Sequence, residues 1–416
     1  MASLKQGSSP RVLAVLPGII PSTALTVIKP LLGLEARGAV QARFMLEWLI
    51  QPRDLDWADI LIFCRNMEPN FSQAFHWAIA QGKPYIYDID DNFFDLPKDT
   101  EEFSYYNTPE RQGLLIEYLT HAALVRVYSP PMLERVTAIT EQVVRTPAPV
   151  DLALVHLPNP KDLKPLKIVY ATSRKVDPLF SIFWPALQRI LIDYDGRIEA
   201  HFWGFFAQKF ARLKGIHYHA PTANYDSFLR NFSRSGFSIG LAPLFDTNFY
   251  RSKTNNKFRE YGACRVAGIY SDVEVYRECV TDQETGILVD NIEESWYQAM
   301  VQLIEDENLR LHIQTQAEIV VREQYSEEIF ESTWMEQIQA ILDRQSSSIG
   351  MSNRQSFSES SLLSAKRPGI LSQMVYQVKK AVTILRRDKL ASVIERLWFK
   401  AEQIFLLLKI TSMRRF

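Results

Sequence analysis

The feature that most limits the fold of this chain is an alternation between short, β-branched apolar runs and longer segments with helical spacing. In the first part of the chain, the runs that predict strands are Val12–Leu16, Ala39–Ala42, Ile60–Phe63, Tyr85–Tyr87, Leu124–Tyr128 and Leu154–Leu157. One of the intervening helices is predicted to begin after Thr108, which precedes Pro109 and Glu110, and to end near His121. This alternation is typical of parallel α/β units.

A proline-rich segment, residues 146–165, interrupts the alternation, which then restarts. The second set of predicted strands is Lys167–Ala171, Ile198–Trp203, Ile216–His219, Phe237–Ala242, Val266–Tyr270 and Ile287–Val289. The sequence therefore predicts an α/β protein with two Rossmann-like, doubly wound domains, at residues 1–160 and 161–345. Ligands of such sheets bind outside the carboxyl ends of the strands, so we expect a central cleft between the domains.

A serine-rich linker is predicted at 346–368, followed by a basic amphipathic helix at 369–416. Residues 366–416 hold 12 Lys and Arg against 3 Asp and Glu, a net charge of +9, whereas the whole chain has −1. The remaining residues 1–365 therefore carry −10. The helix is suited to an anionic membrane surface, to the acidic body or to a partner protein, and the acidic body argues against nucleic acid.

Several protein classes are disfavoured by what the sequence contains. The three cysteines, Cys64, Cys264 and Cys279, have neither metal spacing nor the pairing of a disulfide framework. The apolar stretch near the N-terminus is too short for a signal peptide, and no apolar run is long enough to cross a bilayer. We therefore expect a cytoplasmic protein, with peripheral membrane contact through the tail. The glycine-rich dinucleotide fingerprint and the Walker lysine motif are absent, which disfavours dehydrogenases and NTPases.

The segment RSKTNNKFREYG, residues 251–262, places cations and asparagines at a predicted helix start, after the predicted strand region 236–244. Unpaired N–H groups and the helix dipole favour an anion at such a place. Ser252, Lys253, Asn256 and Lys257 are therefore candidates for binding phosphate. Glu260, one turn further on, is placed to accept hydrogen bonds from sugar hydroxyls. The alternative is a solvated helix face without a ligand.

Motifs on both sides of this segment resemble those of GT-B glycosyltransferases, in particular glycosyltransferase family four (group 1). The likeness covers about 330 residues, from near Arg11 to near Leu342. The residues that carry it are Lys167–Lys175, Ile239–Leu244, Ser252, Lys253, Lys257, Glu260–Gly262, Ser271, Asp272, Tyr276, Thr285–Val289, Trp296 and Asp306–Arg310, with Tyr85–Pro97 and Leu124–Val136 in the first domain.

The resemblance implies a sugar transfer from a nucleotide-diphosphate sugar to a glycan or a lipid-linked acceptor. It implies that Glu260 holds the ribose hydroxyls and that Ser173, Arg174 and Lys175 face the diphosphate, whose developing charge fixed cations stabilise without a metal. It also implies retention of anomeric configuration, no cofactor, and a helix after Ser326 that crosses back to the first domain. Members of the family usually have a second glutamate eight positions before the first, where this chain has Ser252.

Asp88, Asp90 and Asp91 follow a predicted strand and, with Lys253, are the candidate catalytic residues. One interpretation of the three acids is acceptor binding or deprotonation at the cleft. Others are an Asp-x-Asp metal site, the nucleophile loop of haloacid-dehalogenase-like phosphatases, and Asp91-Asn92 capping the next helix. The motif lies fourth in its sheet, which disfavours the phosphatase, and GT-B enzymes manage without a metal, so we predict no metal site.

Two further hypotheses remain open at this point. One is a non-catalytic protein that binds a nucleotide-sugar or a glycan, which Ser252 in place of the usual glutamate favours. The other is a metal-dependent transferase that uses Asp88 and Asp90. The seven histidines show no ligand spacing, but His217 and His219 share a strand face and either line a nucleobase pocket or are structural.

Overall fold

A computed structural model describes residues 9–98, 100–158, 165–172, 174, 177–205, 213–222, 224–349, 403–408 and 410. The chain forms two compact units, residues 1–341 and 342–416. The second unit is described only at 342–349, the end of a long helix, and at 403–408 and 410, which are helical. Most of the predicted linker and tail therefore lies outside the described residues. No helix in the described ranges is long and apolar enough to span a membrane.

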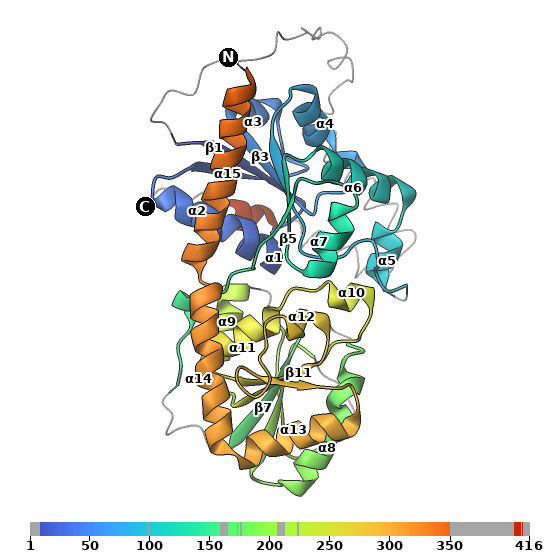
Figure 1. Cartoon of the computed structure of the whole chain (residues 1–416), viewed down its shortest axis with the longest axis vertical. Helices are drawn as coiled ribbons and strands as arrows, with labels where there is room; N and C mark the ends of the chain where they lie inside the picture. The colour runs from blue at the N-terminus through green and yellow to red at the C-terminus, as the bar shows by residue number, and fades with distance from the viewer. Residues whose placement is uncertain are drawn as a thin grey trace. The chain divides into compact units, whose positions relative to one another are not determined.

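The first lobe of residues 1–341 is built on a six-stranded parallel sheet in the order β2-β1-β3-β4-β5-β6 (Figure 1). The strands are β1 (Arg11–Leu16), β2 (Gln41–Leu46), β3 (Ile60–Cys64), β4 (Tyr85–Asp88), β5 (Leu124–Val127) and β6 (Val143–Arg145). β3 and β4 are buried along their whole length, which explains why Ile60–Cys64 and Tyr85–Tyr87 are continuous apolar runs. The α-helices of this lobe are α1 (Pro21–Thr23), α2 (Lys29–Ala36), α3 (Pro52–Trp57), α4 (Gln73–Ala80), α5 (Glu101–Tyr106), α6 (Pro109–His121) and α7 (Pro130–Thr137), with a π-helix, η1 (Ala24–Ile28), between α1 and α2.

The second lobe holds another six-stranded parallel sheet, in the order β12-β11-β10-β7-β8-β9. Its strands are β7 (Leu166–Ala171), β8 (Ile198–Trp203), β9 (Ile216–His219), β10 (Ile239–Ala242), β11 (Ala267–Ser271) and β12 (Ile287–Val289). Its helices are α8 (Phe180–Asp193), α9 (Tyr225–Arg234), α10 (Asn248–Arg251), α11 (Asn256–Ala263), α12 (Glu274–Arg277), α13 (Glu293–Glu305) and α14 (Glu307–Gln324). The prediction of two doubly wound sheets is confirmed. The boundary at 160 stays a prediction, because 159–164 lie outside the described residues.

The order of each sheet identifies where a ligand is expected to bind. Strand order reverses between β1 and β3 in the first sheet and between β7 and β10 in the second. In open α/β sheets, ligands bind at the carboxyl ends of the two strands that flank this reversal. The candidate residues of the second lobe follow these two strands, since Arg174 comes after β7 and Ser252 to Glu260 come after β10.

Two predicted strands differ from the structure. Residues 154–157 do not form a strand, because Asp151 caps a short 3-10 helix, η3 (Leu152–Leu154), by accepting a hydrogen bond from the Ala153 N–H. The sixth strand is instead β6, which is only three residues long and partly exposed. The strand predicted at Ala39–Ala42 lies later, at β2, where exposed and buried residues alternate as they do at a sheet edge.

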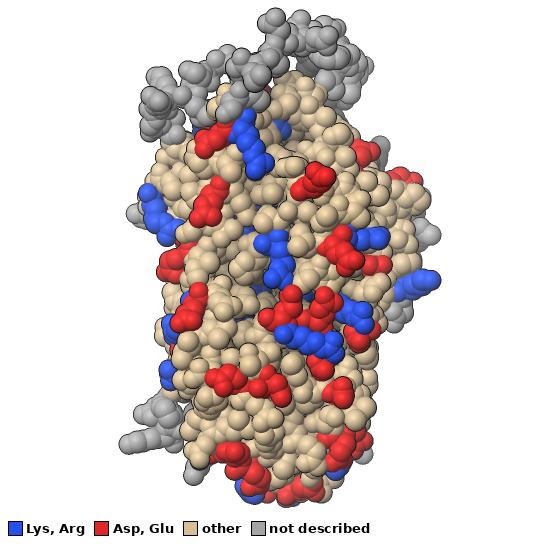
Figure 2. All heavy atoms as spheres, in the orientation of Figure 1, with Lys and Arg blue, Asp and Glu red and all other residues tan. Residues whose placement is uncertain are grey.

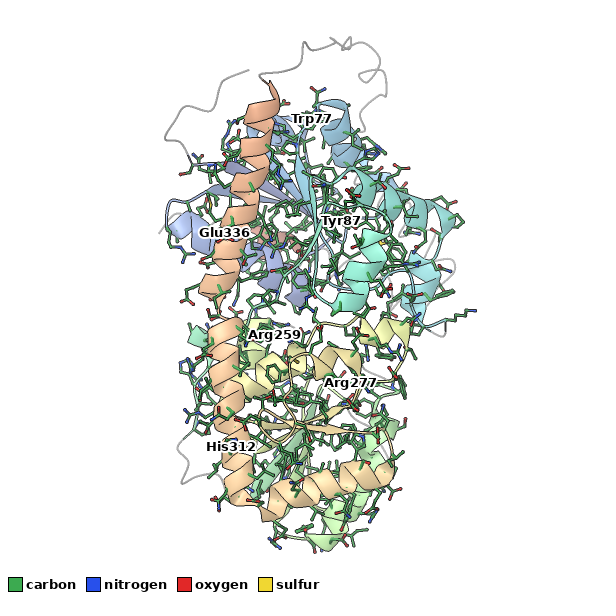
Figure 3. All side chains as sticks on the ribbon, in the orientation of Figure 1. Trp77, Tyr87, Arg259, Arg277, His312 and Glu336 are labelled. Carbon is green, nitrogen blue, oxygen red and sulfur yellow. The ribbon has the colours of Figure 1, made fainter. Side chains whose placement is uncertain are left out.

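The helix after Ser326 crosses back to the first lobe, as predicted. This is α15 (Glu327–Ile349), shown in Figure 1. Its Trp334 Nε1 donates a hydrogen bond of 2.8 Å to the Thr26 carbonyl. The crossing lies beside the earlier connection between the lobes, because the Val150 N–H donates to the Tyr325 carbonyl at 2.9 Å. Arg259 of α11, labelled in Figure 3, donates to the Pro149 carbonyl of the same connection. The two chain segments that connect the lobes, one near Val150 and one near Tyr325, are therefore hydrogen-bonded to each other.

Candidate functional site

The carboxyl end of the first sheet contacts the loop between α10 and α11 of the second lobe. Ser252 is buried in this contact, accepting a hydrogen bond from Asn92 Nδ2 at 3.1 Å. Its carbonyl accepts a second one from Ser129 Oγ at 2.9 Å. The segment that contains Lys253 therefore lies between the two sheets rather than facing bulk solvent.

Lys253 forms an ion pair with Asp91 across this contact. Its Nζ lies 2.7 Å from Asp91 Oδ1 and 2.9 Å from Oδ2, and both side chains are about four-fifths buried, at 21% and 19% exposure. Burial raises the pKa of Asp91, but Lys253 and then Arg65 lower it more, so the pKa lies below its usual value. Asp91 is therefore a carboxylate at neutral pH. A phosphate that approached Lys253 would replace this carboxylate as its partner.

Asp88 and Asp90, the other two acids, have different surroundings. Asp88 is fully buried and accepts hydrogen bonds from Tyr128 Oη at 2.5 Å and from Thr26 Oγ1 at 3.0 Å. Burial raises the pKa of Asp88 to about 6, against the effect of Arg126, whose Nε lies 3.4 Å away. Asp90 accepts from Arg65 Nε. Both carboxylates are thus hydrogen-bonded by other side chains of the protein. Their catalytic roles stay predictions.

The alternative in which Asp91-Asn92 caps the next helix is wrong. That helix is α5, and its N-cap is Thr100, whose Oγ1 accepts a hydrogen bond from the Phe103 N–H at 3.2 Å. Asn92 instead closes a tight turn, because its Oδ1 accepts from the N–H groups of Phe94 at 3.0 Å and Asp95 at 3.2 Å. The turn aims Nδ2 of Asn92 at Ser252 in the second lobe.

The helix predicted to start near residue 252 is α11, which starts at Asn256. Two of the candidate donor-binding residues in this segment precede this helix, and the others lie in it. Ser252 and Lys253 lie in a loop, because α10 ends at Arg251 and the Ser252 hydroxyl donates back to the Asn248 carbonyl at 2.6 Å. Lys257 and Glu260 lie in α11 and form a partly buried pair, with Lys257 Nζ 2.7 Å from Glu260 Oε2. Asn256 is exposed, and its Oδ1 accepts from Thr254 Oγ1 at 2.6 Å.

Arg174 follows β7 at the reversal of the second sheet. Its N–H donates to Thr172 Oγ1 at 3.2 Å, and its guanidinium Nη1 lies 3.5 Å from the buried Asp177 carboxylate. The guanidinium carbon lies 5.8 Å from the centre of the Tyr250 ring, beside α10. The Arg174 side chain is 37% exposed, which leaves donors available to a ligand. Ser173 and Lys175, the other candidates here, lie outside the described residues.

Arg65 is the main residue of this region that the sequence analysis did not identify. It follows β3, next to the reversal of the first sheet, and pairs with both Asp90 and Asp91. Its φ is 59°, in the left-handed region that non-glycine residues rarely adopt and that is often found at functional sites. The signal in the sequence that could have identified Arg65 is its position at the end of a strand, on the same edge of the sheet as the three acids.

Charged side chains of both signs lie across the middle of the face drawn in Figure 2, at the level of α10 and α12. Two ion pairs from these elements are Arg251 with Asp246, at 2.5 Å, and Arg277 with Asp272, at 2.6 Å. Opposite charges that alternate in this way cancel at a distance, so this surface has no single-sign field.

Glu47, another buried carboxylate, lies just beyond β2 on the same edge of the first sheet. It is 6% exposed, and its Oε2 accepts a hydrogen bond from the buried Asn66 Nδ2 at 2.7 Å. Burial raises the pKa of Glu47 to about 7, and Glu68 adds to the effect. Because the folded pKa is above the unfolded one, the stability that Glu47 contributes is complete below its unfolded pKa and is lost as the pH rises through 7.

We expect the Glu47→Gln variant to gain stability over the wild type at high pH. The gain in free energy of unfolding should be about 2–3 kcal/mol larger at pH 8 than at pH 5, since each pKa unit corresponds to about 1.4 kcal/mol. Urea denaturation of both proteins at the two pH values measures it. Glu117→Gln, on the exposed side of α6, controls for the loss of one charge. A Glu47→Gln gain that is equal at both pH values would contradict the prediction.

Solved structures share this fold at low sequence identity. HepE of Anabaena, in complex with UDP and glucose, has a TM-score of 0.58 and 12% identity, over 80% of this chain and 100% of that chain. A glycosyltransferase from Rickettsia africae has a TM-score of 0.55 and 15% identity, over 80% and 99%. A putative UDP-N-acetylglucosamine 2-epimerase from Listeria monocytogenes has 0.55 and 13%, over 81% and 98%.

The chain also matches TarM, at a TM-score of 0.50 and 14% identity, but spans only 54% of that longer chain. No family model matches the sequence, and no curated protein matches it either. Likeness at these identities concerns the fold. The two parallel six-stranded sheets and the helix that returns to the first lobe are the GT-B fold, as the sequence predicted.

Proposed function

We propose that the protein is a metal-independent glycosyltransferase, with a nucleotide-diphosphate sugar bound by the second lobe and a glycan or lipid-linked acceptor bound mainly by the first. The observation that supports it best is the contact of Ser252 and Lys253 with Asn92 and Asp91, which puts the basic segment between the carboxyl ends of the two sheets. UDP is the nucleotide to test first, because HepE is solved with UDP and with UDP-glucose.

In the reaction, the bond between the anomeric carbon and the diphosphate oxygen breaks, and an acceptor oxygen forms the new bond and loses its proton. Negative charge develops on the leaving diphosphate. Arg174 is positioned to stabilise that charge at the end of β7, and Lys253 can do so once it exchanges Asp91 for phosphate. After this exchange the Asp91 carboxylate keeps its pair with Arg65 at 3.6 Å, and it belongs to the first lobe, where the acceptor would bind and where it can accept the proton. By resemblance to the family, the anomeric configuration is retained.

The non-catalytic alternative has one specific observation in its favour. At the position where the family usually has a glutamate, Ser252 is buried and its hydroxyl is used within the protein, by Asn248 and Asn92. A side chain engaged in this way offers nothing to a donor sugar. The structural likeness to an epimerase adds epimerisation of a UDP-sugar as a third function to test.

Incubation of the full chain with a panel of UDP-sugars, followed by NMR of the products, separates these functions. We expect sugar transfer to an added acceptor or slow hydrolysis to UDP and free sugar. Conversion of a UDP-sugar into its C2 epimer would assign an epimerase instead. Binding of UDP-sugars by calorimetry without any conversion would assign the non-catalytic alternative.

Glu260→Ala is expected to weaken UDP binding by about 10–100-fold, because it removes a charged hydrogen-bond acceptor for the ribose hydroxyls. Glu260 lies in α11 with only 8% of its side chain exposed, held by Lys257. Calorimetric titration with UDP measures the change. Glu260→Gln, which keeps the shape and one acceptor oxygen, should lose less. Equal affinity of the wild type and Glu260→Ala would remove Glu260 from the nucleotide site.

A further inference from the structure

A second polar cluster lies at the outer edge of the second sheet, on strands β8 and β9. Alternate residues of a strand share a face, which places Glu199 and His201 together on β8 and His217 and His219 together on β9. The parallel register pairs His201 directly with His217. His201 and His219 are 18 positions apart in the chain. Their spacing matches no metal-binding motif, so the sequence predicted no metal site, and the pairing of the strands shows that they lie together.

Three of these residues point their ligand atoms at one another. Glu199 Oε2 lies 3.2 Å from His201 Nε2, and Glu199 Oε1 lies 3.5 Å from His217 Nε2. One nitrogen or oxygen from each of the three residues lies within 4.8 Å of the others. His201 is buried, whereas 48% of the His217 side chain is exposed, so the cluster is closed towards the sheet and open to solvent on one side.

We propose that Glu199, His201 and His217 bind a divalent transition-metal ion such as Zn²⁺. Imidazole nitrogen with one carboxylate oxygen is a ligand set that suits zinc, nickel, cobalt and copper rather than calcium or magnesium. The exposed side at His217 leaves room for a water molecule as a further ligand. One face of the His217 ring stacks on His201, and 48% of the side chain is exposed to solvent.

His219 supports the site without binding the ion itself, through a contact with His201. His201 Nδ1 lies 2.9 Å from His219 Nε2. When His201 binds a metal through Nε2, its proton resides on Nδ1 and is donated to His219, which is the arrangement that orients most metal-binding histidines. The His219 ring is itself fixed, since it stacks on Trp203 with 4.7 Å between ring centres and 8° between planes.

The position of the cluster indicates a structural role for the ion. β9 is an edge strand of the second sheet, held by β8 on one side, and a metal shared by β8 and β9 fastens one strand to the other. The ligands lie on β8 and on the edge strand β9, whereas Arg174 and Lys253 follow β7 and β10 at the reversal of the sheet. We therefore expect the metal to affect the stability of the second lobe and not the chemistry of the transfer.

Titration of tag-free, chelator-treated full chain with Zn²⁺ in a calorimeter tests the site, with Co²⁺ absorption as a second readout of coordination. We expect one ion per chain. His217→Ala and Glu199→Gln, which change partly exposed side chains, should each weaken binding by about 100-fold or more. Zn²⁺ should raise the melting temperature of the wild type but not of His217→Ala.

His312→Ala is the matched control, because His312 on α14 (Figure 3) is an exposed histidine paired with one carboxylate, Glu284, at 2.8 Å. It should bind Zn²⁺ as the wild type does. The proposal is overturned if the wild type shows no saturable binding, or if His312→Ala weakens binding as much as His217→Ala. Far-UV circular dichroism of each metal-free variant checks that it folds.

Discussion

Arg174→Ala should lower kcat/KM for sugar transfer by about 10²–10³-fold, the range found when a preorganised donor to a developing anion is removed. Arg174 lies at the end of β7, where the order of the second sheet reverses, and the buried Asp177 holds its guanidinium in place. Asp177 is itself fixed by Tyr170 Oη, which donates to it at 2.6 Å. The cation is therefore positioned before the diphosphate begins to leave.

Because the leaving diphosphate gains negative charge in the transition state beyond the charge that it already carries in the bound donor, the loss should fall more on kcat than on KM. Steady-state kinetics with a UDP-sugar measures both constants. Arg174→Lys should recover part of the rate, since it restores the charge without the planar fork of donors. Arg189→Ala is the control, because Arg189 is an exposed arginine of α8 that pairs with Glu293 and Glu294. Equal kcat values for Arg174→Ala and Arg189→Ala would exclude Arg174 from the reaction.

Trp334→Ala is expected to have the largest effect on stability, a loss of about 3–5 kcal/mol in free energy of unfolding. The Trp334 side chain is fully buried between α15 and the first lobe. Its ring lies 3.6 Å from the guanidinium carbon of Arg126, which is also fully buried. Alanine would leave a cavity, remove the hydrogen bond to the Thr26 carbonyl and take away the aromatic face that Arg126 contacts.

Urea denaturation followed by circular dichroism measures this loss. Trp334→Phe should cost about 1–2 kcal/mol, because it keeps a ring over Arg126 and gives up the hydrogen bond. Glu336→Ala, two positions along α15 on its exposed side (Figure 3), should change stability by no more than about 0.5 kcal/mol. A Trp334→Ala protein as stable as Glu336→Ala would mean that α15 does not hold the first lobe together.

The sequence predicted an element correctly where a single physical requirement, such as complete burial or helix capping, determines its residues. Strands such as β3, which is buried on both faces, must be apolar throughout, and the pattern predicted them correctly. The start of α6 was predicted because Thr108 caps it, its Oγ1 accepting from the Arg111 N–H at 3.4 Å. β6 was missed because it is short and partly exposed, so nothing in its composition separates it from a loop.

The sequence predicted at which ends of the sheets the candidate residues lie, but it did not predict which of them form ion pairs with one another. The acids after β4 and the lysine after α10 were expected near the carboxyl ends of their sheets, and both lie there. The ion pair between Asp91 and Lys253 joins residues 162 positions apart and depends on how the two lobes pack. Arg65 carries no motif, and its role follows only from a left-handed backbone that turns it towards Asp90.

The two connections between the lobes also set the way in which the lobes can move. A hydrogen bond joins Val150 to Tyr325, and Lys29 adds ion pairs with Asp151 at 2.6 Å and with Asp226 at 2.7 Å at the same place. Because both covalent links between the lobes meet at this one point, the lobes cannot separate there. Any relative movement of the lobes is therefore smallest near Val150 and Tyr325 and largest at the residues furthest from them.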